Sequence, residues 1–229
     1  MDDATTPVYF WRETGPEGYL SQWWSSDPFT SSDSPPRTFK TAEHYMMHGK
    51  ALLFSDAAAA LAILKADHPR KVKALGRKVK GFDGAVWDAN RERLVREGNL
   101  LKFRCAPALR ALLLATGDRE LVEASPLDRI WGIGFSPEKA PETDRSRWGL
   151  NLLGKVLMEV RTVLREEEMH HDRQRKEHAA KRRRITGKED DDNNGGVKRV
   201  KEGAEVEEKD ERDPTEMARS QGDVQEHAQ

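Results

Sequence analysis

The chain has 229 residues, enough for one large domain or two small ones, and a formal net charge of −1. That balance excludes a partner selected by bulk charge alone, and the single cysteine, Cys105, excludes an internal disulfide framework. The first residues lack the basic and apolar regions of a signal peptide, and no apolar run approaches the roughly 20 residues that cross a membrane. We therefore expect an intracellular protein, cytoplasmic or nuclear or both, with no membrane partner and with Cys105 as a structural thiol.

Composition divides the chain near residue 165. Residues 1–165 carry 25 Lys and Arg against 21 Asp and Glu (net +4), whereas residues 166–229 carry 14 against 19 (net −5). All 6 Trp, 7 Phe and 3 Tyr precede residue 149, and the last 64 residues contain no Leu. Such a segment cannot bury enough apolar surface to offset a backbone ordering cost of about 1–2 kcal/mol per residue. We expect a flexible N-terminus over 1–7, one compact domain over 8–165 and a disordered, charged tail over 166–229.

The patterns of apolar residues and of turn residues predict a mainly α-helical domain with a few short β-strands. Aromatic and β-branched runs predict strands over 8–11, 19–24, 121–124 and 130–135, with a loop over 25–37. Caps and helical spacing predict helices over 41–54, 55–66, 69–80, 83–103, 107–115 and 147–166. The last helix carries an apolar stripe of Leu150, Leu153, Leu157, Val160 and Leu164.

One pair of charged residues on the first expected helix could carry chemistry. At 100° per residue, Glu43 and Lys50 fall within about 40° of one another, on a stripe that also holds Met47 and Phe54. Their backbone positions are about 10 Å apart along the axis, so both could converge on a ligand lying across the face. Geometry alone leaves a second interpretation open, in which two charges simply border a buried stripe.

Metal binding has little support in the sequence. His44 and His48 have the i,i+4 spacing of zinc ligands, but no further ligand cluster accompanies them. Structural or surface histidines explain them, and we expect no metal and no redox cofactor.

Three further segments could bind a phosphorylated ligand. Trp131 with Gly132 and Gly134 offers a flat ring beside backbone that a ligand can approach closely, and a tight turn on a core Trp explains the pattern almost as well. Residues 149–155 open the last helix, where free N–H groups could bind phosphate with help from Asn151 or Lys155; the alternative is close helix packing at the glycines. The cationic run over 70–80 could steer an anionic substrate or form a solvated helix face.

The order of these motifs along the chain carries a resemblance. The series comprises Leu20-Ser-Gln22-Trp-Trp, Ala-Glu43-His-Tyr, Lys50, Leu75-Gly-Arg77, Trp87, Lys102-Phe103, Leu112-Leu-Leu-Ala-Thr-Gly117, Leu121-Val-Glu123, Asp128-x-x-Trp131-Gly and Asn151-x-Leu-Gly154. Over residues 8–165 this closely resembles the NADAR family of YbiA-like N-glycosidases.

The resemblance implies a mostly helical fold and cleavage of an N-glycosidic bond between a ribose phosphate and a base or amine. The associated substrates are early riboflavin intermediates and ADP-ribosylated guanine, the latter carried on nucleic acid. Glu43 and Lys50 are the implied catalytic residues. The implied substrate-binding residues are Gln22, Trp24, His44, Arg77, Asp128, Trp131, Gly132, Asn151 and Lys155.

Chemistry agrees with these roles. A buried carboxylate such as Glu43 can stabilise the positive charge that develops on the sugar, or activate water. Lys50 could attack the anomeric carbon through a Schiff base if its pKa is lowered, or hold a phosphate if it stays charged. Many bacterial members of the family have Trp-Gly-Asp-Gly where this chain has Ile133, and Asn where it has Gln22. The missing carboxylate could be replaced by Asp128 or Glu123, or the substrate could differ.

The tail holds two basic clusters, Lys181-Arg-Arg-Arg184 and Lys198-Arg-Val-Lys201, separated by 13 residues. They resemble a bipartite nuclear import signal bound by an import receptor, and a charge-balanced solubilising tail explains them equally well. Two other functions remain open beside the enzyme. One is a catalytically silent ADP-ribose or NAD-binding module, and the other is a nuclear adaptor without ligand.

Overall fold

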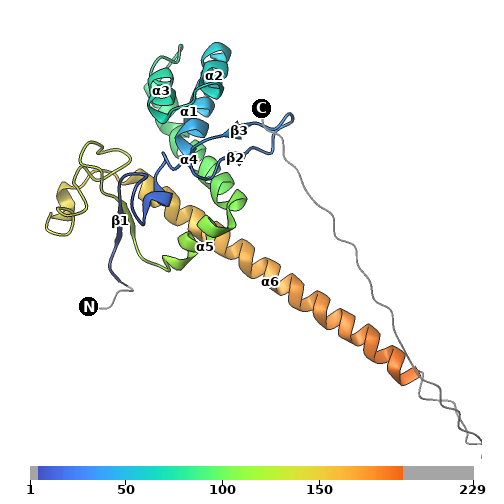
Figure 1. Ribbon diagram of the computed structural model, residues 1–229. Coiled ribbons are helices and arrows are strands. Elements are labelled where there is room, and N and C mark those ends of the chain that lie inside the picture. The colour runs from blue at the N-terminus through green and yellow to red at the C-terminus, as the bar shows by residue number, and fades with distance from the viewer. Residues whose placement is uncertain (1–4, 193–229) are drawn as a thin grey trace, which may run out of the picture. The chain divides into compact units, whose positions relative to one another are not determined.

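The computed structural model describes the backbone of residues 5–192 and the side chains of residues 5–182. The helices of this part are α1 (Ala42–Leu53), α2 (Ala57–Leu64), α3 (Pro69–Gly76), α4 (Gly84–Cys105), α5 (Pro107–Ala115) and α6 (Leu152–Asp192) (Figure 1). The strands are β1 (Val8–Phe10), β2 (Phe29–Thr30), β3 (Thr38–Phe39) and β4 (Leu121–Glu123), and short 3-10 helices cover Gly18–Leu20 and Arg145–Arg147. The expected mainly helical fold class is confirmed.

Side-chain caps explain where the helices begin. Thr41 Oγ1 accepts a hydrogen bond from His44 N at 3.0 Å and starts α1. Asp56 and Asp83 accept equivalent bonds at the starts of α2 and α4. Such a cap satisfies a backbone donor that the helix itself leaves unpaired, and each contributes about 1 kcal/mol. The first turns of α3 and α5 contain proline, as the sequence predicts, and His68 Nδ1 also accepts from Arg70 N at the start of α3.

Helix α1 lies at the centre of the helical layer. It packs against α2, α3 and α4 (Figure 1). Its contact with α3 is close at Gly76, where an added Cβ atom would lie 2.0 Å from Met47 Sδ. Lys73, one turn earlier on α3, is thereby held beside the same helix.

The start of α6 closes the other side of the core. Leu153, Leu157, Val160 and Leu164 are fully buried there, so most of the expected apolar stripe is confirmed. Leu150 is the exception, since it precedes the helix and is half-exposed.

A short pair of parallel strands joins the N-terminal end of the domain to the segment that follows α5. Strand β1 pairs with β4 in a register that places Phe10 opposite Glu123. Ala124 N then donates to Phe10 O at 2.7 Å, and Ile133 N donates to Glu123 O at 2.9 Å. The end of β4 is therefore fixed on both sides.

Three expected elements differ from the structure. Residues 19–24 form no strand; the chain turns through Gly18–Leu20, and a buried lysine described below binds its carbonyl groups. Residues 130–135 form no strand either, because a single bond, from Ile133 N to Glu123 O, joins them to β4, and their carbonyl groups accept from residues 149–153. The expected loop over 25–37 contains β2, which pairs with β3.

The last helix starts later and ends later than expected. It begins at Leu152 and continues to Asp192, so the expectation of disorder from residue 166 is wrong over 166–192. Met169 and Ile185 are the large apolar residues of this stretch, which is otherwise rich in good helix formers. Glu167 pairs with Arg104 on α4. The second basic cluster of the proposed import signal and the rest of the expected disordered tail lie outside the described residues.

None of the helices in the described part is both long enough and apolar enough to cross a membrane. Cys105, the last residue of α4, is exposed and so is not packed as a structural thiol.

Candidate active site

Glu43 is a buried carboxylate in the first turn of α1. The residue is 5% exposed, and its Oε1 atom has neither solvent contact nor a hydrogen-bond partner. Its backbone N donates to Gln22 O at 2.9 Å, which joins the start of α1 to the segment that follows Leu20. A buried acceptor without a partner costs about 1–3 kcal/mol, so its retention points to a use other than stability.

The charges around Glu43 come from α3 and the turn after it, from the loop after β4, and from α1 itself. Burial raises the pKa of Glu43 to about 7, and Asp128, in the loop after β4, raises it further. Lys73, Arg77 and Lys50 oppose this effect and favour the ionised form. The carboxyl group is thus balanced between its two protonation states near neutral pH, as a group that transfers a proton requires.

Gln22, whose backbone carbonyl accepts from Glu43 N, has unused hydrogen-bonding capacity in its side chain. Both Oε1 and Nε2 of its side chain are buried without a partner. The preceding residues are held by Lys102, whose Nζ donates to Tyr19 O at 2.6 Å and to Ser21 O at 3.0 Å. Burial lowers the pKa of Lys102 to about 7. The lysine thereby fixes the chain from which Gln22 projects.

Glu123, the last residue of β4, is a second carboxyl group in this cluster. Its Oε2 atom is buried without a partner. Burial raises the pKa of Glu123 to about 8, Asp128 and Glu43 raise it further, and Lys73 opposes them. Glu43 and Glu123 each have a buried carboxyl oxygen without a hydrogen-bond partner. The charge of Glu43 raises the pKa of Glu123, and Lys73 lowers the pKa of both.

Lys50 lies two helical turns further along α1, among aromatic rings. Its Nζ is 4.2 Å from the ring centroid of Phe82 and 5.2 Å from that of Trp87. Burial lowers the pKa of Lys50, while the charge of Glu43 opposes that change. Desolvation increases the fraction of neutral amine, which is the nucleophilic form.

The start of α6 does not form the phosphate site that the glycines suggested. The N–H groups of Asn151, Leu152 and Leu153 donate to the carbonyl oxygens of Gly132, Ile130 and Trp131. The Asn151 side chain is fully engaged as well, since its Oδ1 accepts from Glu123 N and its Nδ2 donates to Leu121 O. The Asn151 side chain thus joins the start of α6 to β4. Lys155 is exposed on α6.

Gly132 and Asp128 shape the loop after β4. An added Cβ atom at Gly132 would lie 2.6 Å from Glu123 O, so only glycine lets this loop fold against the strand. Asp128 Oδ1 accepts from Ile130 N and from Trp131 N, both at 2.8 Å, which fixes the partly buried Trp131.

Two of the expected substrate-binding residues are engaged elsewhere. His44 is 1% exposed, its Nδ1 accepts from Lys40 N, and its Nε2 lies 2.8 Å from Ile63 O. Both ring nitrogens therefore have partners within the protein, and a substrate contact by His44 stays a prediction. Trp24 donates its indole N–H to Asp27 at 2.8 Å.

Ile133 explains how the chain accommodates the absence of the usual Asp. Its side chain is fully buried in a small apolar cluster with Val122, Ala124 and Ala140. Position 133 therefore contributes apolar packing, and the nearby carboxyl groups are Asp128 and Glu123.

Sequence reasoning missed Lys73 and Trp23. Lys73 influences both buried carboxyl groups and lies 5.9 Å from the Trp23 ring centroid. The signal was present, since Lys73 and Arg77 are four residues apart and share one face of α3. Lys73 is partly buried, whereas Arg70 and Lys71 in the same cationic run are exposed.

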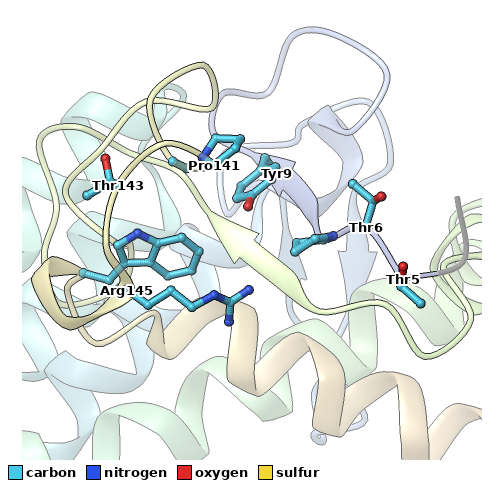
Figure 2. A pocket seen from close by; sticks show the side chains of 9 residues that line it. Thr5, Thr6, Tyr9, Pro141, Thr143 and Arg145 are labelled. Carbon is cyan, nitrogen blue, oxygen red and sulfur yellow. The ribbon is translucent and has the colours of Figure 1, made fainter. Parts of the chain in front are cut away.

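A separate cavity of about 370 Å³ lies beside β1 (Figure 2). Its walls include the edge-to-face pair of Tyr9 and Trp148, with ring centroids 6.4 Å apart, and the side chain of Arg145. None of the residues expected for chemistry lines it. Within residues 5–192 no group of three or more His, Cys, Asp or Glu side chains could hold a metal ion.

The fold and the cluster define a mainly helical domain in which two carboxyl groups with buried, partnerless oxygens lie near cationic side chains. The NADAR domain family model matches residues 9–165, and the chain belongs to this family. The N-glycosidase R617 of Acanthamoeba polyphaga mimivirus is 46% identical over 124 residues, which are 54% of this chain and 73% of R617. The N-glycosidase Npun_R5314 of Nostoc punctiforme is 35% identical over 158 residues, 69% of this chain and 92% of that protein. The NMR structure of Escherichia coli YbiA matches with a TM-score of 0.59 at 28% identity, over 74% of this chain and 89% of YbiA.

The burial of Glu43 predicts a pH-dependent cost to stability. The pKa is about 7 in the folded protein against 4.5 for an unperturbed Glu, so between these values the folded state binds more protons than the unfolded state. Stability therefore falls as pH rises through this range, by about 3 kcal/mol at most. We expect Glu43→Gln to unfold at higher denaturant concentration than the wild type at pH 8, with the difference shrinking toward pH 5. Urea titrations at both pH values measure it, and a constant difference would contradict it.

Proposed function

We propose that this protein hydrolyses the N-glycosidic bond between a phosphorylated ribose and a base or amine. The observation that carries the proposal is Glu43, which is buried, lacks a partner at Oε1 and is balanced between protonation states by surrounding cations. Relatives named N-glycosidases match the same part of the chain.

The charges suit this chemistry. Breaking a ribosyl C–N bond develops positive charge on the sugar, and an ionised Glu43 stabilises it most strongly in a site without bulk water. Lys73 and Arg77 act on this carboxylate and can hold a phosphate attached to the ribose. Other exposed cations of α3 and the turn after it, Arg70, Lys71, Lys78 and Lys80, attract such an anion.

Lys50 has the surroundings of a nucleophile. Its amine is partly desolvated by rings, which favours attack on the anomeric carbon and a covalent sugar–lysine intermediate. In this mechanism Glu43 accepts the proton that the amine loses.

The substrate proposed first is ADP-ribosylated guanine in nucleic acid, and an early riboflavin intermediate is the second. The basic clusters of the tail favour the first, since a nuclear address fits a substrate carried on nucleic acid. The apolar Ile133 in place of an Asp also separates this chain from the bacterial members with which the second substrate is associated.

The test incubates the full chain with an oligonucleotide containing ADP-ribosylated guanine and, separately, with an aminouracil ribosylamine phosphate. Release of unmodified guanine strand or of free aminouracil is measured by mass spectrometry. We expect turnover of at least one substrate, with preference for the first. Binding of ADP-ribose without turnover of either substrate would overturn the proposal and indicate a silent binding module.

A further inference from the structure

We propose that Glu123 is a second catalytic carboxyl group, which donates a proton to the leaving nitrogen while Glu43 and Lys50 act at the sugar. This inference rests on the proposed function and deepens it.

The placement of Glu123 is fixed by three contacts of its backbone. Its N–H donates to Asn151 Oδ1 at 2.9 Å, its carbonyl accepts from Ile133 N, and Gly132 packs directly on that carbonyl. The strand, the loop and the start of α6 thus hold one residue in place. The side chain, by contrast, has no hydrogen-bond partner at Oε2. A rigid backbone with an unengaged carboxyl group is the arrangement of a group reserved for substrate.

Glu123 has fewer neighbouring cations than Glu43, which favours the protonated form of Glu123 and the ionised form of Glu43. Glu123 faces Glu43 on α1 and Asp128 in the loop after β4, and one cation, Lys73 on α3, opposes them. Glu43 faces Asp128 but also Lys73, Arg77 and Lys50. More cations act on Glu43 than on Glu123, so in the proposed mechanism the proton of the pair lies on Glu123 and its negative charge on Glu43.

The reaction balances with these groups. The Lys50 amine forms a bond to the anomeric carbon and loses a proton to Glu43. The C–N bond to the base breaks, its electron pair goes to the leaving nitrogen, and that nitrogen takes the proton of Glu123. Water then hydrolyses the sugar–lysine bond, and the proton on Glu43 returns to Glu123 through solvent.

The test compares the wild type with Glu123→Gln, Glu123→Asp and a matched exposed control, Glu142→Gln, on whichever substrate the wild type cleaves. For Glu123→Gln we expect kcat to fall about 10²–10⁴-fold, as for loss of a general acid, with KM within about threefold. The wild-type rate should fall on both sides of a maximum between pH 7 and 8, and the fall on the alkaline side should disappear in Glu123→Gln. Glu123→Asp should recover part of kcat, and the control should match the wild type.

Two results would overturn the role of Glu123 alone. One is a raised KM with unchanged kcat, which would make Glu123 a ligand of the sugar hydroxyls. The other is an alkaline fall that persists in Glu123→Gln. A wild type that cleaves neither substrate overturns the proposed function instead, and with it this role.

An NMR titration tests the interaction between Glu43 and Glu123 independently of catalysis. Carboxyl ¹³C NMR of the full chain should show the pKa of Glu123 well above 4.5 and lower in Glu43→Gln than in the wild type. A pKa near 4.5, or one insensitive to Glu43→Gln, would overturn the assignment of the proton to Glu123.

Discussion

We expect Glu43→Gln to abolish turnover, with kcat reduced about 10³-fold or more, while the domain remains folded. Glutamine has nearly the same volume, so α1 keeps its packing, and the backbone bond from residue 43 to Gln22 O at 2.9 Å does not involve the side chain. The amide cannot accept a proton, and it carries no charge to offset positive charge on the sugar. Loss of either effect costs about 10²–10⁴-fold in rate. Steady-state assays of the purified full chain measure the loss, and circular dichroism measures the fold.

The control for this variant is Glu92→Gln, which makes the same chemical change at an exposed position of α4. Its kcat should equal that of the wild type. Wild-type turnover by Glu43→Gln would show that the centre is misassigned. An inactive Glu43→Gln protein that is also less stable than the wild type at pH 8 would indicate a structural role, because removing a buried charge that serves only function should raise stability there.

Local sequence patterns were sufficient to predict where most of the helices begin. Thr41, Asp56 and Asp83 cap α1, α2 and α4 within one residue of where the expected helices begin, because a cap depends only on a side chain and the next three residues. The pairing of Glu43 with Lys50 on α1 also follows from helical spacing, and each influences the pKa of the other.

The rest of the site depends on contacts between distant segments. Residues 19–24 look β-prone, yet Lys102, more than 80 residues away, binds the carbonyl groups of Tyr19 and Ser21. The glycines at 149 and 154 suggested free N–H groups, but residues 130–132 already accept from the next donors along the chain. No spacing rule reveals such partners, because they belong to the tertiary fold.

The expectation of disorder over residues 166–192 was wrong for a different reason. Composition correctly indicated that residues 166–192 cannot form a core, but a helix needs no core of its own when it extends one that is already formed. The first fifteen residues of α6 supply that nucleus, with Leu153, Leu157 and Val160 fully buried.

We expect borohydride added during turnover to trap the sugar on Lys50. We also expect Lys50→Arg to lower kcat about 10³-fold and to remove the trapped product. Neutral lysine can attack the anomeric carbon and form an imine, which borohydride reduces, whereas arginine stays protonated and cannot. The pKa of Lys50 is lowered by burial among rings that include Phe82 and Trp87, which supplies the neutral form. Peptide mass mapping locates the added sugar phosphate at residue 50.

The choice of arginine separates the two roles that Lys50 could have. Arginine keeps the positive charge and the contact with aromatic rings, so a phosphate clamp would survive the change with kcat within about tenfold of the wild type. A nucleophile would not survive it. Lys65→Arg, an exposed position at the end of α2, is the matched control and should leave both rate and trapping unchanged. Trapping that persists in Lys50→Arg would place the covalent step on another lysine, and Lys73, the cation shared by Glu43 and Glu123, would be the first to test.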